Sequence, residues 1–176
     1  MPTRSRQILE CRLSTCLRYR YLLRVSLCPD QPTSQTLTLI LKNPSTADAN
    51  RGDPTTGKVE AWACQHGYGI VTYLNLFALR SPYPKVLNTV SFQDAIGAEN
   101  DRILQSELTD AQIIIIAWGN PNGIDPIRYQ QRIVEVNRLL SHSQKSIHTV
   151  GKYTLLGYPR HGLQWRKEME IGRLSD

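Results

Sequence analysis

Residues 39–48 read Leu-Ile-Leu-Lys-Asn-Pro-Ser-Thr-Ala-Asp, an apolar run that stops abruptly at a polar turn. The run predicts a buried strand, and Asn43-Pro44 marks its expected end. In an open α/β sheet, ligands bind just beyond the carboxyl ends of the strands. The Asn43 amide would lie there, and Ser45 or Thr46 could cap the next turn so that backbone N–H groups face an anion. The alternative is an ordinary strand end with capping residues.

Strand and helix patterns alternate on both sides of this stretch. We expect strands at 36–42, 70–74, 113–118 and 154–156, and helices at 55–66, 97–108 and 125–141. The run at 113–118 is continuously apolar, as is typical of a parallel sheet. Repeated strand-helix-strand units imply right-handed crossovers, so we predict an α/β protein, a three-layer α/β/α sandwich with a mainly parallel central sheet. Residues 12–27 predict an added antiparallel strand or a hairpin.

Length and composition fit a single domain over residues 1–176, with a basic N-terminal strand or hairpin in 1–30 and an α/β core in 36–165. No apolar run approaches the roughly 18 residues that span a bilayer, and no signal-type apolar core follows the N-terminus. We therefore expect a cytoplasmic protein that does not bind a membrane. The four cysteines form no C-x-x-C pair, and we expect no metal and no cofactor.

The net charge of +6 favours a polyanionic partner. We expect nucleic acid, with DNA favoured over RNA, or a nucleotide. Arg18, Arg20 and Arg24 are separated by even numbers of residues, so a strand could place several guanidiniums on one face. The alternative is a solvated edge strand that uses charge to resist aggregation.

Polar loops follow each predicted central strand. If the strands are parallel, these loops meet at one edge of the sheet and bring amides, arginines, a histidine and carboxylates into one cleft. For several of them a structural role is the alternative: Asn75 as a cap, Phe77 as a core residue, and Asp53 as the N-cap before Pro54. Asp48 and Asp53 are weak evidence for a metal site. The loop residues singled out are Asp48, Asp53, Asn75, Phe77, Arg80, Asn120, Arg160 and His161.

A set of short motifs runs from about Tyr19 to His161. These motifs are Asn43-Pro44-Ser45-Thr46-Ala47-Asp48, Asp53-Pro54-Thr55, Gly67-Tyr68-Gly69, Asn75-Leu76-Phe77-Ala78, Glu99-Asn100-Asp101, Ala117-Trp118-Gly119 and Pro159-Arg160-His161. Together they resemble the domain-of-unknown-function family sixteen-forty-three, which carries no secure biochemical activity. The resemblance therefore supplies a family and no mechanism.

The order of the motifs is also similar, more distantly, to the uracil-DNA glycosylase superfamily, which implies a glycosylase-like fold. By this resemblance Asn43 would orient the attacking water and His161 would stabilise the departing base. Asn75 would read the edge of the base and Phe77 would stack on it. Arg80 and Arg160 would hold phosphates, and Ser45 and Thr46 would contact the substrate.

Three functions stay open from the sequence. The first is hydrolysis of an N-glycosidic bond in nucleic acid or a nucleoside. The second is a non-catalytic module that binds nucleic acid or a nucleotide in the same cleft. The third is a protein-interaction domain that uses the basic N-terminal strand. The sequence leaves the catalytic status and the oligomeric state undecided.

Overall fold

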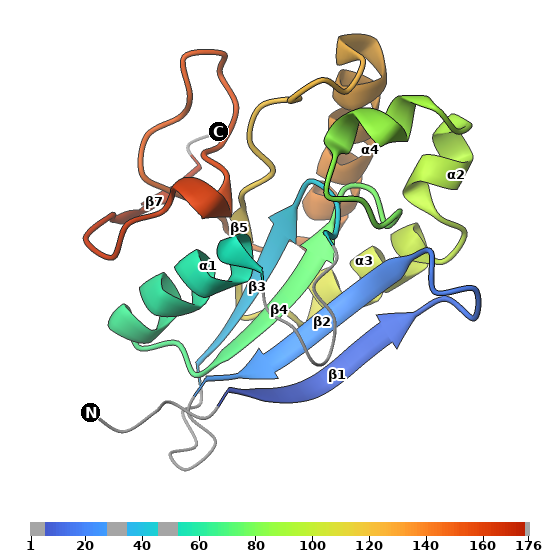
Figure 1. Ribbon diagram of the computed structural model, residues 1–176. Coiled ribbons are helices and arrows are strands. Elements are labelled where there is room, and N and C mark those ends of the chain that lie inside the picture. The colour runs from blue at the N-terminus through green and yellow to red at the C-terminus, as the bar shows by residue number, and fades with distance from the viewer. Residues whose placement is uncertain (1–5, 28–34, 46–52, 175–176) are drawn as a thin grey trace.

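Seven strands form one sheet at the centre of the structure, a computed structural model that describes residues 6–27, 35–45 and 53–174 (Figure 1). Their order across the sheet is β1-β2-β4-β3-β5-β6-β7. The central strands β4, β3, β5 and β6 are parallel, while β1, β2 and β7 run antiparallel to their neighbours. The strands are β1 (Gln7–Leu13), β2 (Arg20–Ser26), β3 (Thr36–Leu41), β4 (Ile70–Asn75), β5 (Ile113–Ile116), β6 (Ile147–Val150) and β7 (Ile171–Arg173).

Helices cover both faces of this sheet (Figure 1). On one face, Val59, Trp62 and Ala63 of helix α1 (Pro54–Gln65) pack against β3 and β4. The other face packs against α2 (Phe92–Ile96), α3 (Asn100–Asp110) and α4 (Pro126–Ser143). Single 3₁₀ turns lie at Pro84–Asn88 and Gly162–Gln164. The fold is therefore mixed α/β, with an apolar core on each side of the sheet.

Most of the predicted elements are confirmed to within a few residues. The N-terminal segment is a hairpin, because β1 and β2 pair antiparallel. Helix α1 begins after Asp53, whose side chain accepts a hydrogen bond from the Thr56 N–H at 2.8 Å and so caps the helix. Gly67 follows the end of α1 with a φ of +81°, the left-handed conformation that glycine adopts without strain.

The predicted final strand at 154–156 is wrong. Those residues form a turn, closed by hydrogen bonds from Gly157 N–H to the Thr154 carbonyl at 2.9 Å and from Thr154 N–H to the Tyr158 carbonyl at 2.8 Å. Gly157 has a φ of +78°, which favours the turn over continued extension. The strand that pairs in parallel with β5 is instead β6. Strand β7, which the sequence did not indicate, pairs antiparallel with β6.

The pairing of the strands places several chain segments at one edge of the sheet. The chain beyond β4 stays beside the end of β3, because the Phe77 N–H donates to the Lys42 carbonyl at 3.0 Å. The Ala117 N–H beyond β5 likewise donates to the Ile40 carbonyl at 2.8 Å. Since β2 is antiparallel to β4, its first residue, Arg20, reaches the same edge. The carboxyl ends of β3, β4 and β5 thus meet the start of β2.

Candidate functional site

A polar pocket of about 250 Å³ lies at this edge of the sheet. It is lined by the start of β2, the end of β3 with its following loop, the first turn of α1, the loops after β4 and β5, and the turn that holds His161. The side chains in its wall that carry charge or can form hydrogen bonds are Arg20, Lys42, Asn43, Ser45, Asp53, Thr55, Thr56, Ser81, Asn122 and His161. The predicted residues Asn43, Ser45, Asp53 and His161 therefore come together.

Asn43 is held by its own amide group. Its side-chain nitrogen donates to the Ser81 carbonyl at 2.9 Å and to the Pro44 carbonyl at 3.2 Å. Both amide hydrogens are therefore used to fix the side chain against the loop after β4. The amide oxygen accepts no hydrogen bond from the part of the chain that the structure describes, so it can accept one from a ligand or a water molecule.

Asp53 links the Asn43 loop to helix α1. One carboxylate oxygen accepts from the Thr56 N–H at 2.8 Å, and the other accepts from the Ser45 hydroxyl. The Thr56 hydroxyl in turn accepts from the Asp53 N–H at 3.0 Å, which completes a capping box. The expected N-cap role of Asp53 is confirmed, and its carboxylate is engaged on both oxygens.

His161 occupies the turn before the 3₁₀ segment Gly162–Gln164. Its Nδ1 accepts a hydrogen bond from the Leu163 N–H at 3.1 Å, so the neutral ring carries its proton on Nε2. Burial, with a further contribution from the positive charge of Lys42, lowers the pKa of His161 to about 4, while Asp53 opposes this shift. The imidazole is thus neutral at pH 7 and can act as a hydrogen-bond donor.

Two glycines allow the close approach of neighbouring segments to His161. A Cβ atom on Gly162 would lie 2.7 Å from the Val59 side chain of α1. Gly119, which follows β5 with a φ of +69°, packs its backbone against the His161 side chain. The motif Trp118-Gly119 therefore serves to seat the last loop against the end of β5.

Sequence reasoning did not select Lys42, which directly follows β3. Its side chain is only 3% exposed, and its Nζ lies 5.9 Å from the centre of the Tyr129 ring. Burial lowers the pKa of Lys42 to about 8. Among the described residues its ammonium group has no hydrogen-bond or carboxylate partner. The sequence does hold a signal for this residue, because a lysine directly after a buried strand lies at the edge of the sheet where ligands bind.

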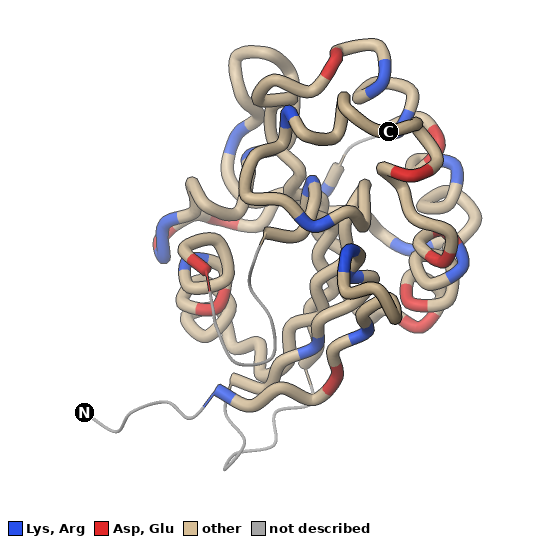
Figure 2. Tube along the Cα trace, turned by 45° about the vertical axis from the view of Figure 1, so that its right-hand side comes forward, with Lys and Arg blue, Asp and Glu red and all other residues tan. Residues whose placement is uncertain are grey.

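Arg20 was expected on a basic strand face and lies instead in the wall of the pocket. It is 2% exposed, and burial lowers its pKa while the charge of Asp53 opposes the shift. Arg24, four residues further along β2, forms a salt bridge with Glu10 at 2.8 Å and another with Glu107. Lys and Arg are interleaved with Asp and Glu along the helices as well (Figure 2). Arg18 is exposed near the ring of Tyr19.

The remaining predicted residues lie outside the pocket wall. Phe77 is fully buried in the core, edge-on to the ring of Phe92 at 6.3 Å between centroids. Arg80 donates to the Leu17 carbonyl at 3.2 Å, and Arg160 donates to the Lys152 carbonyl at 3.3 Å.

Asn120 and Asn75 also lie outside the wall. The Asn120 side-chain oxygen accepts from the Thr154 hydroxyl at 2.7 Å. Asn75 is 1% exposed at the end of β4, and both polar atoms of its side chain lack a hydrogen-bond partner among the described residues. Thr46 and Asp48 lie outside the described residues.

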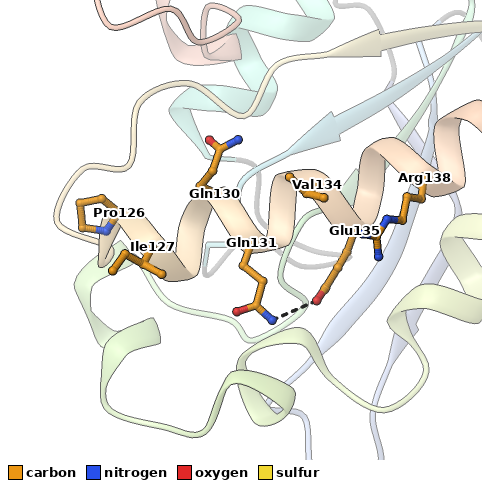
Figure 3. Close-up of a pocket in the computed structure, with 7 residues that line it drawn as sticks. All are labelled: Pro126, Ile127, Gln130, Gln131, Val134, Glu135 and Arg138. Carbon is orange, nitrogen blue, oxygen red and sulfur yellow. Dashed lines mark hydrogen bonds between the residues drawn. The ribbon is translucent and has the colours of Figure 1, made fainter.

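A second, larger hollow of about 650 Å³ runs along α4. Figure 3 shows that its lining side chains come from this one helix, with Gln131 donating to Glu135 at 3.2 Å. Ile127 is 80% exposed there. The hollow joins no residues from separate segments, and we place the candidate site in the polar pocket.

The described part of the chain contains no group of three or more His, Cys, Asp or Glu side chains that could hold a metal ion. It also contains no helix that is both long enough and apolar enough to cross a bilayer.

Comparison with known proteins identifies the family. The model of a family described as "Protein of unknown function (DUF1643)" matches residues 20–163. The chain belongs to this family. The DUF1643 region begins at Arg20 and ends at Leu163, so it contains every residue of the pocket wall, while β1 and β7 lie outside it. No curated protein and no solved structure matches the chain.

Proposed function

We propose that the pocket binds a nucleotide or nucleic-acid ligand and hydrolyses its N-glycosidic bond, in a fold related to that of the uracil-DNA glycosylases. The observation that supports this best is that Asn43 and a neutral His161 line the same pocket, although 117 residues, 161 minus 43 minus 1, separate them in the chain. Both stand beyond the ends of sheet strands, where α/β proteins bind their ligands.

The two side chains suit the charges that develop in this reaction. As the bond between sugar and base breaks, positive charge builds on the sugar and the base leaves with the bonding electron pair. The Nε2–H of His161 can donate a hydrogen bond to the negative base. The side-chain oxygen of Asn43, which accepts no hydrogen bond from the described residues, can accept one from the water that adds to the sugar carbon. Asn43 does not titrate, so this water would be oriented and not deprotonated by it. The proton that the water loses as it adds to the sugar would be taken up by the base anion, which leaves as the neutral base.

A non-catalytic binding module is the second candidate, and the position of two residues favours it. Phe77 is in the core, and Asn75 is outside the pocket wall, so neither contacts a base placed in the pocket as it stands. A module of this kind would bind its ligand through the cationic residues of the pocket wall and would not discriminate among bases.

The test is release of free base from uracil- and hypoxanthine-containing oligonucleotides and from nucleosides and nucleotides. We expect product from the wild type, and a loss of about a hundredfold or more in rate with Asn43→Ala or His161→Ala. Asn137→Ala, an exposed substitution on α4, is the matched control and should keep full activity. Ligand binding without product from any substrate would refute hydrolysis and leave the binding module.

A further inference from the structure

Two buried cations share the wall of the polar pocket. Arg20 begins β2 and Lys42 follows β3, and they are 2% and 3% exposed. Since β4 lies between β2 and β3, their backbones are roughly 10 Å apart, two strand spacings. Both side chains line the same pocket.

The charge of Lys42 has no counterpart among the described residues. Burying an ammonium group costs free energy unless an anion or hydrogen-bond acceptors surround it. Asp53 is the one carboxylate among the described wall residues, and it is already engaged by Ser45 and Thr56. The Tyr129 ring, 5.9 Å away, offers only a cation–π contact. The missing partner is therefore expected to come from the ligand.

The depth of these cations distinguishes between kinds of anion. Proteins that bind the backbone of a nucleic-acid strand use cations spread over an accessible surface, because a phosphodiester chain continues on both sides of each phosphate. Here both cations line a pocket of about 250 Å³, and Lys42 has no carboxylate partner among the described residues. Arg6, Arg12 and Arg24 on the hairpin are each paired with a glutamate. A pocket of this size suits a terminal phosphate and the sugar that carries it.

We propose that Lys42 and Arg20 form a subsite for a phosphate monoester, so that the pocket takes a free nucleoside monophosphate in place of an internal position of a strand. This inference rests on the proposed function for the identity of the rest of the ligand. The phosphate would lie between the two cations, and the sugar would extend toward Asn43 and His161. Charge-assisted hydrogen bonds from both cations would supply most of the affinity.

The experiment measures binding by calorimetry at pH 7 with the full chain. The probes are ribose 5-phosphate, ribose, a nucleoside 5′-monophosphate and the methyl ester of that monophosphate. We expect ribose 5-phosphate to bind and ribose not to bind, and the monoester to bind at least tenfold more tightly than its methyl diester. Equal binding of ribose and ribose 5-phosphate would overturn the inference.

Variants then assign the subsite. Lys42→Met should weaken binding of ribose 5-phosphate at least tenfold, the loss expected for one charged hydrogen bond. Lys58→Met, an exposed lysine of α1, should leave it unchanged. Arg20→Lys keeps the buried charge and should weaken binding less than Arg20→Gln does, provided that both remain folded by circular dichroism. Unchanged binding by Lys42→Met would refute the subsite.

The outcome can be separated from that of the proposed function. Binding of ribose 5-phosphate that depends on Lys42, with no base released from any substrate, supports the subsite and refutes hydrolysis. Base release from oligonucleotides, with no binding of ribose 5-phosphate, supports hydrolysis and refutes the subsite.

Discussion

Gly119 and His161 are in direct contact, because a Cβ atom at position 119 would lie 2.7 Å from the His161 Cβ. This distance is shorter than atoms tolerate, and the φ of +69° at Gly119 also disfavours any other residue. The end of β5 therefore determines where the last loop can place its histidine.

Gly119→Ala is expected to lower the free energy of unfolding by about 1–3 kcal/mol and to shift His161 away from the pocket. Urea denaturation measures the first effect, and the NMR signals of the His161 ring measure the second. Gly57→Ala is the control, because a Cβ there meets nothing within 4 Å, and in helix α1 it should stabilise by about 0.5–1 kcal/mol. A fully stable Gly119→Ala with an unmoved His161 would contradict the packing.

Asn75→Leu is expected to leave stability unchanged or to raise it. Both polar atoms of the Asn75 side chain are buried without partners among the described residues, so removing them loses no described hydrogen bond. Asn100→Leu is the contrasting variant, because the Asn100 amide nitrogen donates to the carbonyls of Asn75 and Leu76, both at 3.1 Å. It should cost about 2 kcal/mol or more. Denaturant unfolding compares the two, and a larger loss for Asn75→Leu would be inconsistent with this structure.

Lys42→Met is expected to stabilise the protein at pH 7 by about 1–3 kcal/mol, because it removes a buried charge and keeps a similar apolar stem. The folded-state pKa of Lys42 is about 8, against 10.5 as the ordinary value. Between these values the unfolded chain binds more protons, so wild-type stability gains a contribution that rises with pH. Thermal unfolding from pH 7 to 10.5 should show this gain in the wild type and in Lys58→Met. Its persistence in Lys42→Met would refute the assignment to this lysine.

His161 should make the protein sensitive to acid. Its folded-state pKa of about 4 lies below its ordinary value of 6.5, so the folded state resists protonation of the ring. Stability from this residue is fully present above pH 6.5 and is lost as the pH falls through 4. His161→Asn should flatten the stability profile between pH 4 and 6.5, and its side-chain oxygen can still accept from the Leu163 N–H. His142→Asn, at the exposed end of α4, should retain the wild-type slope.

The elements predicted correctly are those with strong local signals. Helix α1 is bounded by Asp53-Pro54 at its start and by Gly67 after its end. Asp53 caps the helix with its side chain, and Gly67 ends it by adopting a positive φ, so both effects are local. The apolar run of β3 stops at Asn43-Pro44 for equally local reasons. The two strands β6 and β7 differ, because they are short and owe their strand state to pairing with each other and with β5.

The candidate site was predictable only where a residue follows a parallel strand. Asn43 could be placed at this edge by that rule. The expected place of His161 rested on a strand at 154–156 that does not form, and contact with Gly119 after β5 is what holds His161 at the edge. Arg20 could not, since its position depends on β2 pairing antiparallel with β4, a contact between distant parts of the chain. Phe77 follows β4 as Asn43 follows β3, but α2 and its Phe92 cover it. Tertiary packing decides whether a side chain that follows a strand end is buried or faces the pocket, and no local sequence pattern encodes that packing.

The pocket is assembled from residues near both ends of the family region, and this has a consequence for synthesis. At roughly 5–20 residues per second, translation delivers His161 about 6–24 seconds after Lys42, the time needed to add the 119 residues from Asn43 to His161. The hairpin β1–β2 and strands β3 and β4 have all left the ribosome by then. The nascent chain must therefore carry both cations without their neighbouring histidine during most of its elongation, and the site becomes complete only as the last segment docks.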